Sequence, residues 1–181
     1  MWVYFSHHMF RLRKISYGAT AAAVTNTALI SGLSAANATK AIIISALLIA
    51  ALADNLTDAL SVHVYQESER LEQKDALTAT MTNFAARLLL SISFVLIVAV
   101  LPLAHAPAAA LVWGAALLAL LTSLIARERN VKPLPEVFKH LLIAAAAIVL
   151  SRAIGHWISS ASLLIAGVPL VSTRLVDCHK S

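Results

Sequence analysis

The chain has 181 residues, of which 60% are hydrophobic and 13% are charged, and its mean hydropathy is +0.81. A soluble domain of this length would be nearer half apolar and a quarter charged, so the composition excludes an ordinary soluble protein. The formal charge of +5 comes from basic residues that flank apolar segments, which is a feature of membrane topology rather than of nucleic-acid binding. The single cysteine, Cys178, excludes an intrachain disulfide.

Apolar stretches long enough to cross a bilayer, which takes about 20 residues, recur along the chain. We predict five transmembrane helices, at residues 15–33, 38–65, 76–103, 108–126 and 136–158. Pro102 ends the third helix, and Pro133 and Pro135 exclude a continuous helix from the fourth to the fifth. The sequence therefore predicts an all-α, polytopic membrane protein.

Lysine and arginine are concentrated at alternate connections of these helices. The basic side of the predicted bundle carries Arg11, Arg13, Lys14, Arg70, Lys74, Arg127, Arg129, Lys132 and Lys139. The opposite connections offer Lys40. This bias predicts a cytosolic N-terminus and a C-terminus on the far side. We expect a cytosolic segment at 1–14, a five-helix transmembrane domain at 15–160 and a short tail at 161–181, in the plasma membrane of a prokaryote.

Residues 51–69 place Asp54 and Asp58 inside an otherwise apolar helix. The two carboxylates are four residues apart, so they share one face of the helix. A charge in hydrocarbon costs about 2.5–3.5 kcal/mol by insertion scales. We therefore expect this face to point into a bundle, a water-filled path or a partner subunit, and we interpret it as a candidate ion site.

Further oxygen donors accompany the aspartates. Ser61, Tyr65 and Glu69 continue the same face, while Asn26 on the first span is a candidate to supply an amide oxygen opposite them. Carboxylate, amide and hydroxyl oxygens suit divalent cations such as Mg²⁺, Mn²⁺ and Fe²⁺. The predicted metal-binding residues are Asp54, Asp58, Asn26, Ser61, Tyr65, Glu67 and Glu69, with Glu67 and Glu69 attracting cations at the cytosolic mouth. For Asn26, a hydrogen bond to backbone or to a neighbouring helix is the more ordinary interpretation.

A structural role for the aspartates is the alternative hypothesis. Asn83 and Arg87 lie four residues apart near the cytosolic end of the third span, and Asp58 has a similar depth on the second. An Asp58–Arg87 pair would neutralise both charges, either to hold the helices of a non-transporting scaffold together or as a gate. The sequence holds no glycine-rich phosphate loop, nucleophile elbow or paired-cysteine motif. We therefore expect neither an enzyme nor a bound cofactor.

The first two spans resemble those of the vacuolar iron transporter (VIT) family. The resemblance is carried by five spans and by the segments YGATAAAVTNTALISGL and ALADNLTDALSVHVYQESE, and it covers about residues 16–156. Members of that family are five-span homodimers that export Fe²⁺ or Mn²⁺ from the cytosol in exchange for protons, along a path at the dimer interface. The resemblance implies the same cargo, proton coupling and homodimer, in contact with lipid and without nucleic acid.

The chain departs from the family pattern at several places. Ala21 and Ala22 stand where the family has an Asp-Gly pair, and Asp58 takes a position usually held by methionine. A long Glu-rich cytosolic segment that collects metal is reduced to QESERLEQKD. The chain thus resembles a short, divergent branch, in which Asp54 and Asp58 are expected to replace the missing first-span carboxylate.

Overall fold

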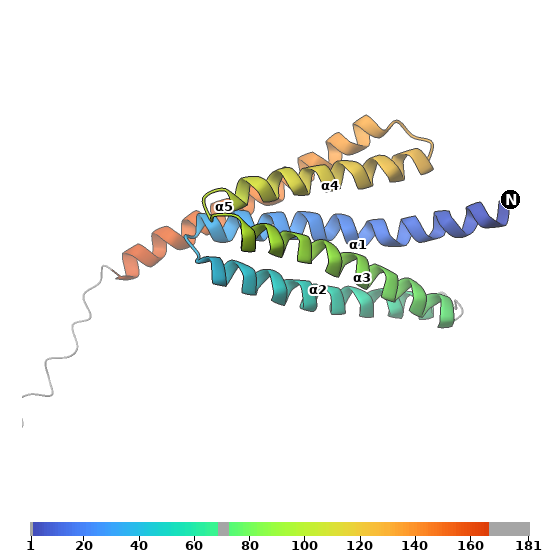
Figure 1. Ribbon diagram of the computed structural model, residues 1–181, viewed down its shortest axis with the longest axis horizontal. Helices are drawn as coiled ribbons and strands as arrows, with labels where there is room; N and C mark the ends of the chain where they lie inside the picture. The colour runs from blue at the N-terminus through green and yellow to red at the C-terminus, as the bar shows by residue number, and fades with distance from the viewer. Residues whose placement is uncertain (1, 69–72, 167–181) are drawn as a thin grey trace, which may run out of the picture.

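The computed structural model describes residues 2–68 and 73–166, and these form α-helices without a strand (Figure 1). This confirms the predicted all-α class. The helices are rich in alanine and leucine, which are strong helix formers. Their bounds are α1 (Trp2–Ala35), α2 (Lys40–Ser68), α3 (Gln73–Val100), α4 (Ala106–Glu128) and α5 (Pro133–Ala166).

Helix α1 lies at the centre of the arrangement and packs against α2, α3, α4 and α5. The α2–α3 hairpin lies on one side of α1 and the α4–α5 hairpin on the other (Figure 1). The turns between α1 and α2 and between α3 and α4 share one end of the molecule. The start of α1 and the α4–α5 connection lie at the opposite end, which we call the N-terminal end.

Within the described residues, four helical segments are long and apolar enough to cross a membrane. They are Lys40–Ser61, Thr80–Val100, Ala106–Glu128 and Pro133–Ala161. The chain is therefore a multi-pass membrane protein, as predicted. Helix α1 is not among the four, and its buried surface includes the polar Asn26, Thr27 and Ser31. A central helix contacts protein on several sides, so less of its surface has to suit lipid; the crossing of α1 and the cytosolic N-terminus stay predictions.

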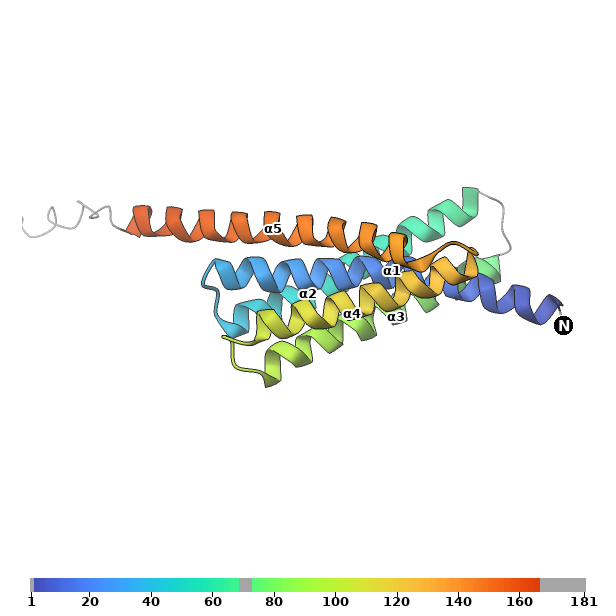
Figure 2. The ribbon, with the colours of Figure 1, turned by 90° about the horizontal axis from the view of Figure 1, so that it is seen from above.

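The helix ends follow the prolines of the sequence. Helix α3 stops at Val100, two residues before Pro102, and α5 begins at Pro133, where a missing N–H leaves no backbone hydrogen bond unmade. The predicted break between the fourth and fifth helices is confirmed. Helix α5 continues to Ala166, beyond the expected start of the tail at residue 161. Figure 2 shows its last turns extending past the α1–α2 turn.

An asparagine caps the C-terminal end of each of the helices α1 and α4. Asn37 and Asn130 adopt left-handed backbone conformations, with φ of 59° and 54°. In each turn the following N–H bonds back across the helix end, from Ala38 to the carbonyl of Leu33 and from Val131 to that of Ala126, both at 3.0 Å. This is the Schellman arrangement, in which asparagine substitutes for the more usual glycine.

Small residues allow the backbone of α1 to lie close to those of α4 and α5. A Cβ on Gly155 of α5 would overlap the backbone of α1 at Gly32, and one on Gly114 of α4 would overlap the hydroxyl of Thr27. The hydroxyl of Ser151 donates to the carbonyl of Ala28 at 2.7 Å, which adds a bond between α5 and α1. Close backbone approach through small residues is the usual means of helix association in lipid.

Candidate functional site

A buried polar stripe on α3 forms the base of the site. Asn83, Arg87 and Ser91 follow one another at four-residue spacing, and each is less than 5% exposed. Residues with this spacing share one face of a helix, and here the face points toward α1 and α2. Buried polar groups in a membrane bundle need partners inside the protein.

Arg87 forms an ion pair with Asp58 of α2. The arginine side chain is almost fully buried, whereas the aspartate side chain is 34% exposed. The structural alternative for Asp58 predicted this pair, and the structure confirms it. Asp58 therefore already has a cationic partner in the conformation described.

Gly18 of α1 lies against the same arginine. A Cβ at this position would lie 2.7 Å from the Cγ and Cδ atoms of Arg87 and would overlap the amide oxygen of Asn83. No real side chain tolerates such contacts without moving its neighbours. Three helices thus meet at the ion pair, with α1 supplying a bare backbone, α2 the carboxylate and α3 the guanidinium.

Asn26 of α1 contributes to the framework on the next turn. Its amide nitrogen donates to the carbonyl of Ala22 at 2.8 Å and to the hydroxyl of Ser91 at 3.0 Å. The side chain is buried and its amide group is tied to α3. This matches the more ordinary interpretation of Asn26, a bond to backbone and to a neighbouring helix, rather than an amide directed at the aspartates.

Asp54 is placed differently from Asp58. It is partly exposed on α2, inside the candidate span Lys40–Ser61, and it makes no hydrogen bond or ion pair within the described part of the chain. The adjacent Asn55 is buried, and its amide nitrogen has no hydrogen-bond partner among the described residues. An intramembrane carboxylate beside a buried polar amide is a costly arrangement for a purely structural segment.

The remaining predicted ligands lie further along α2. Ser61 is exposed, and its hydroxyl donates to the carbonyl of Thr57 at 2.9 Å, which leaves the oxygen free to accept or coordinate. Tyr65 and Glu67 are within α2, but their side chains lie outside the described residues, as does all of Glu69. Among the residues that the structure describes, no group of three or more His, Cys, Asp or Glu side chains converges on one point.

An apolar cluster fills the other half of the α1–α2–α3 unit. Ile30, Ile43, Leu47, Phe94 and Val98 are completely buried there. The polar residues occupy the half nearer the N-terminal end, and the apolar cluster closes the half nearer the α1–α2 turn.

Sequence reasoning missed the burial of Asn55, the contribution of Ser91 and the role of Gly18. A usable signal existed for Ser91, because Asn83, Arg87 and Ser91 repeat at four-residue spacing in an otherwise apolar segment. On α2, the buried residues Ile43, Leu47 and Ala51 repeat at four-residue spacing, and Asn55 is the next position of this series. The same spacing therefore indicates that Asn55 lies on the buried face. The contact between Gly18 and Arg87 depends on how α1 and α3 are aligned, and the pattern of a single helix carries no information about that.

Comparison with protein-family models gives no match for this chain, and comparison with curated proteins gives no similar sequence. The resemblance to the VIT family therefore rests on the segments quoted above.

Proposed function

We propose that the protein is a divalent-cation transporter, which exports Fe²⁺ or Mn²⁺ from the cytosol in exchange for protons and works as a homodimer. The observation that carries the proposal is Asp54, a carboxylate within the α2 span that has no partner in the described part of the chain. A charge facing lipid there costs about 2.5–3.5 kcal/mol, so this surface is expected to face water or protein. The resemblance to the VIT family supports the cargo, its direction and the crossing of α1.

In this proposal the two aspartates have different tasks. Asp54 binds the cation and takes up a proton when the cation leaves. Asp58 is held by Arg87, so that its charge is balanced at the buried polar stripe of α3. Release of Asp58 from Arg87 would add a second carboxylate to the site, so the ion pair acts as a gate.

A homodimer would supply oxygen ligands for the cation that one chain lacks. Divalent cations such as Mg²⁺ and Ca²⁺ take about six or more oxygen ligands, and the described residues of one chain do not gather three acidic or histidine side chains. Helices α2 and α5 flank α1 without packing on each other, so part of α1 and the Asp54 side of α2 are open to a second copy. A second Asp54 would then double the carboxylates of the site.

The Asp58–Arg87 pair also supports a second candidate function. In a non-transporting membrane scaffold the pair would serve assembly alone, and Asp54 would bind a partner protein. The two functions differ in what Asp54 does, because a scaffold moves no metal.

The deciding experiment measures Fe²⁺ and Mn²⁺ uptake into proteoliposomes of the purified protein, with and without a pH gradient. We expect gradient-dependent uptake, its loss in Asp54→Asn with an unchanged unfolding temperature, and no change in Glu136→Gln, which removes a carboxylate from the first turn of α5. Uptake that survives Asp54→Asn would overturn the assignment of the cation site. An absence of uptake by folded, dimeric protein would favour the scaffold.

A further inference from the structure

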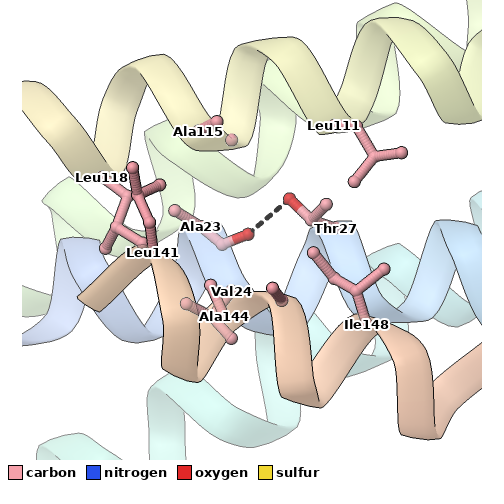
Figure 3. A pocket seen from close by; sticks show the side chains of 11 residues that line it. Ala23, Val24, Thr27, Leu111, Ala115, Leu118, Leu141, Ala144 and Ile148 are labelled. Atoms are coloured by element: carbon pink, nitrogen blue, oxygen red, sulfur yellow. Dashed lines mark hydrogen bonds between the residues drawn. The ribbon is translucent and has the colours of Figure 1, made fainter. Parts of the chain in front are cut away.

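A pocket of about 210 Å³ lies between α1, α4 and α5, remote from the aspartates (Figure 3). Residues of α1 line the bottom of the pocket, and residues of α4 and α5 line its two sides. Gly114 brings α4 close to α1 at Thr27, and alanines on either side leave the space unfilled. Its lining includes Ala23 and Thr27 of α1, Ala115 and Leu118 of α4, and Ala145 of α5.

The lining of this pocket is apolar. Its one hydroxyl, that of Thr27, donates to the carbonyl of Ala23 at 2.7 Å, which satisfies that donor inside α1. An apolar cavity of about 150 Å³ already stays dry and accepts a benzene-sized molecule, so the present one suits hydrocarbon rather than water.

The pocket opens toward the bilayer. Ala115 on α4 and Ala145 on α5 belong to its lining and are both exposed. Both lie inside candidate membrane spans, Ala106–Glu128 and Pro133–Ala161. The medium at this opening is therefore the acyl-chain region of the membrane.

A basic surface lies at the end of the same hairpin. Between residues 127 and 139 the sequence holds four basic and two acidic residues, and Arg127, Arg129 and Lys132 are exposed. Leu134 and Phe138 are also exposed in this segment, at 81% and 68%. Basic side chains interleaved with exposed apolar ones are typical of protein that meets anionic headgroups at the membrane surface.

The distance between the two features matches one phospholipid. From Arg129 down α4 to Leu118 is about 16 Å at 1.5 Å per residue, and half of the hydrocarbon core is about 15 Å. We infer that an anionic phospholipid binds here, with its phosphate at the basic α4–α5 connection and one acyl chain in the α1–α4–α5 pocket. The inference does not depend on metal transport, nor on which leaflet is cytosolic.

Neighbouring alanines on α4 provide a matched test of the acyl-chain half. Ala115 and Ala116 are both exposed, but Ala115 lines the α1–α4–α5 pocket, whereas Ala116 lines a separate, more open apolar hollow of about 580 Å³ between α3 and α4. Lipid binding to the full chain in detergent is measured by native mass spectrometry, with phosphatidylglycerol, phosphatidylcholine and inorganic phosphate as probes. We expect Ala115→Leu to abolish saturable phosphatidylglycerol binding and Ala116→Leu to leave it intact.

The headgroup half is tested with Arg129→Gln plus Lys132→Gln, and with Arg152→Gln, an exposed arginine in the second half of α5, as the control. Each basic contact is worth about fivefold in affinity, so the double variant should bind phosphatidylglycerol about 30-fold more weakly, while the control is unchanged. Phosphatidylcholine should bind more weakly than phosphatidylglycerol, and inorganic phosphate should not stabilise the protein. Equal binding of the two lipids, equal effects of the two alanine variants, or equal stabilisation by phosphate would each overturn the inference.

Discussion

Gly18 of α1 lies so close to Arg87 of α3 that a Cβ on the glycine would be 2.7 Å from two carbons of the arginine side chain. The same arginine reaches Asp58 on α2. The position of the guanidinium, and with it the ion pair, therefore depends on the absence of a side chain on α1. Packing and electrostatics are coupled at this junction of three helices.

The substitution Gly18→Ala tests this coupling. Alanine is favoured over glycine in a helix by about 1 kcal/mol, so propensity alone predicts stabilisation. Overpacking against Arg87 typically costs about 1–3 kcal/mol and should outweigh that gain. We expect a lower unfolding temperature of the purified protein in detergent, together with a smaller effect of Asp58→Asn in the Gly18→Ala background.

The control is Ala85→Gly, at an exposed position on α3. It measures how much stability the helix loses when alanine is replaced by glycine, which is the reverse of the change at Gly18. If Gly18→Ala raised the unfolding temperature by as much as Ala85→Gly lowered it, the contact with Arg87 would carry no cost.

Removal of one partner of the Asp58–Arg87 pair should destabilise the fold strongly. Loss of one member of a buried ion pair costs about 3–5 kcal/mol, and the one-third exposure of Asp58 places Asp58→Asn near the lower end. The double variant Asp58→Asn with Arg87→Gln should lose less than the sum of the single variants, because each single variant leaves one uncompensated charge and the double variant leaves none. Denaturant unfolding of the four proteins in detergent gives the coupling free energy.

The exposed pair of Lys139 and Glu136, 3.0 Å apart on α5, is the control for that cycle. Ion pairs at the protein surface are screened by solvent and contribute little to stability, so Glu136→Gln should have little effect. Strict additivity at Asp58 and Arg87 would show that the pair contributes nothing to stability.

The sequence was sufficient to raise the ion pair as an alternative to a metal site, because two intramembrane charges of opposite sign at equal depth have few other ways to be neutralised. It was not sufficient to place Asn26. Helical spacing shows which face of α1 Asn26 occupies. Its bond to Ser91 also requires α1 and α3 to lie side by side with Asn26 level with Ser91, which is 65 residues later in the chain. Such an alignment is set by tertiary contacts such as that of Gly18, which leave no periodic pattern.

Asn26 and Ser91 should behave as a structural pair. Hydrogen bonds between membrane helices contribute about 0.6 kcal/mol on average, so a cycle of Asn26→Ala and Ser91→Ala should give a coupling free energy near that value. The binding of Mn²⁺ by the purified protein should change by less than twofold in Asn26→Ala, with Ser45→Ala on the exposed face of α2 as the control. A large loss of Mn²⁺ binding with unchanged stability would instead restore Asn26 to the ion path.

The left-handed asparagines differ in one respect that substitution can reveal. The side-chain amide of Asn37 donates to the hydroxyl of Ser159 on α5 at 2.8 Å, whereas no such bond is found for Asn130 within the described residues. Glycine adopts positive φ without strain. Asn130→Gly should therefore leave the unfolding temperature unchanged or raise it, but Asn37→Gly should lower it, because a bond worth about 1 kcal/mol is lost.

Alanine at either position separates the backbone contribution from the side-chain bond. Other L-residues pay about 1–2 kcal/mol for the left-handed conformation, so Asn37→Ala and Asn130→Ala should both destabilise the protein, and Asn37→Ala by more. Ser159→Ala removes the same hydrogen bond without touching the backbone and should reproduce the difference between Asn37→Gly and Asn130→Gly. Identical unfolding temperatures for the two glycine variants would show that the Asn37–Ser159 bond does not tie the α1–α2 turn to α5.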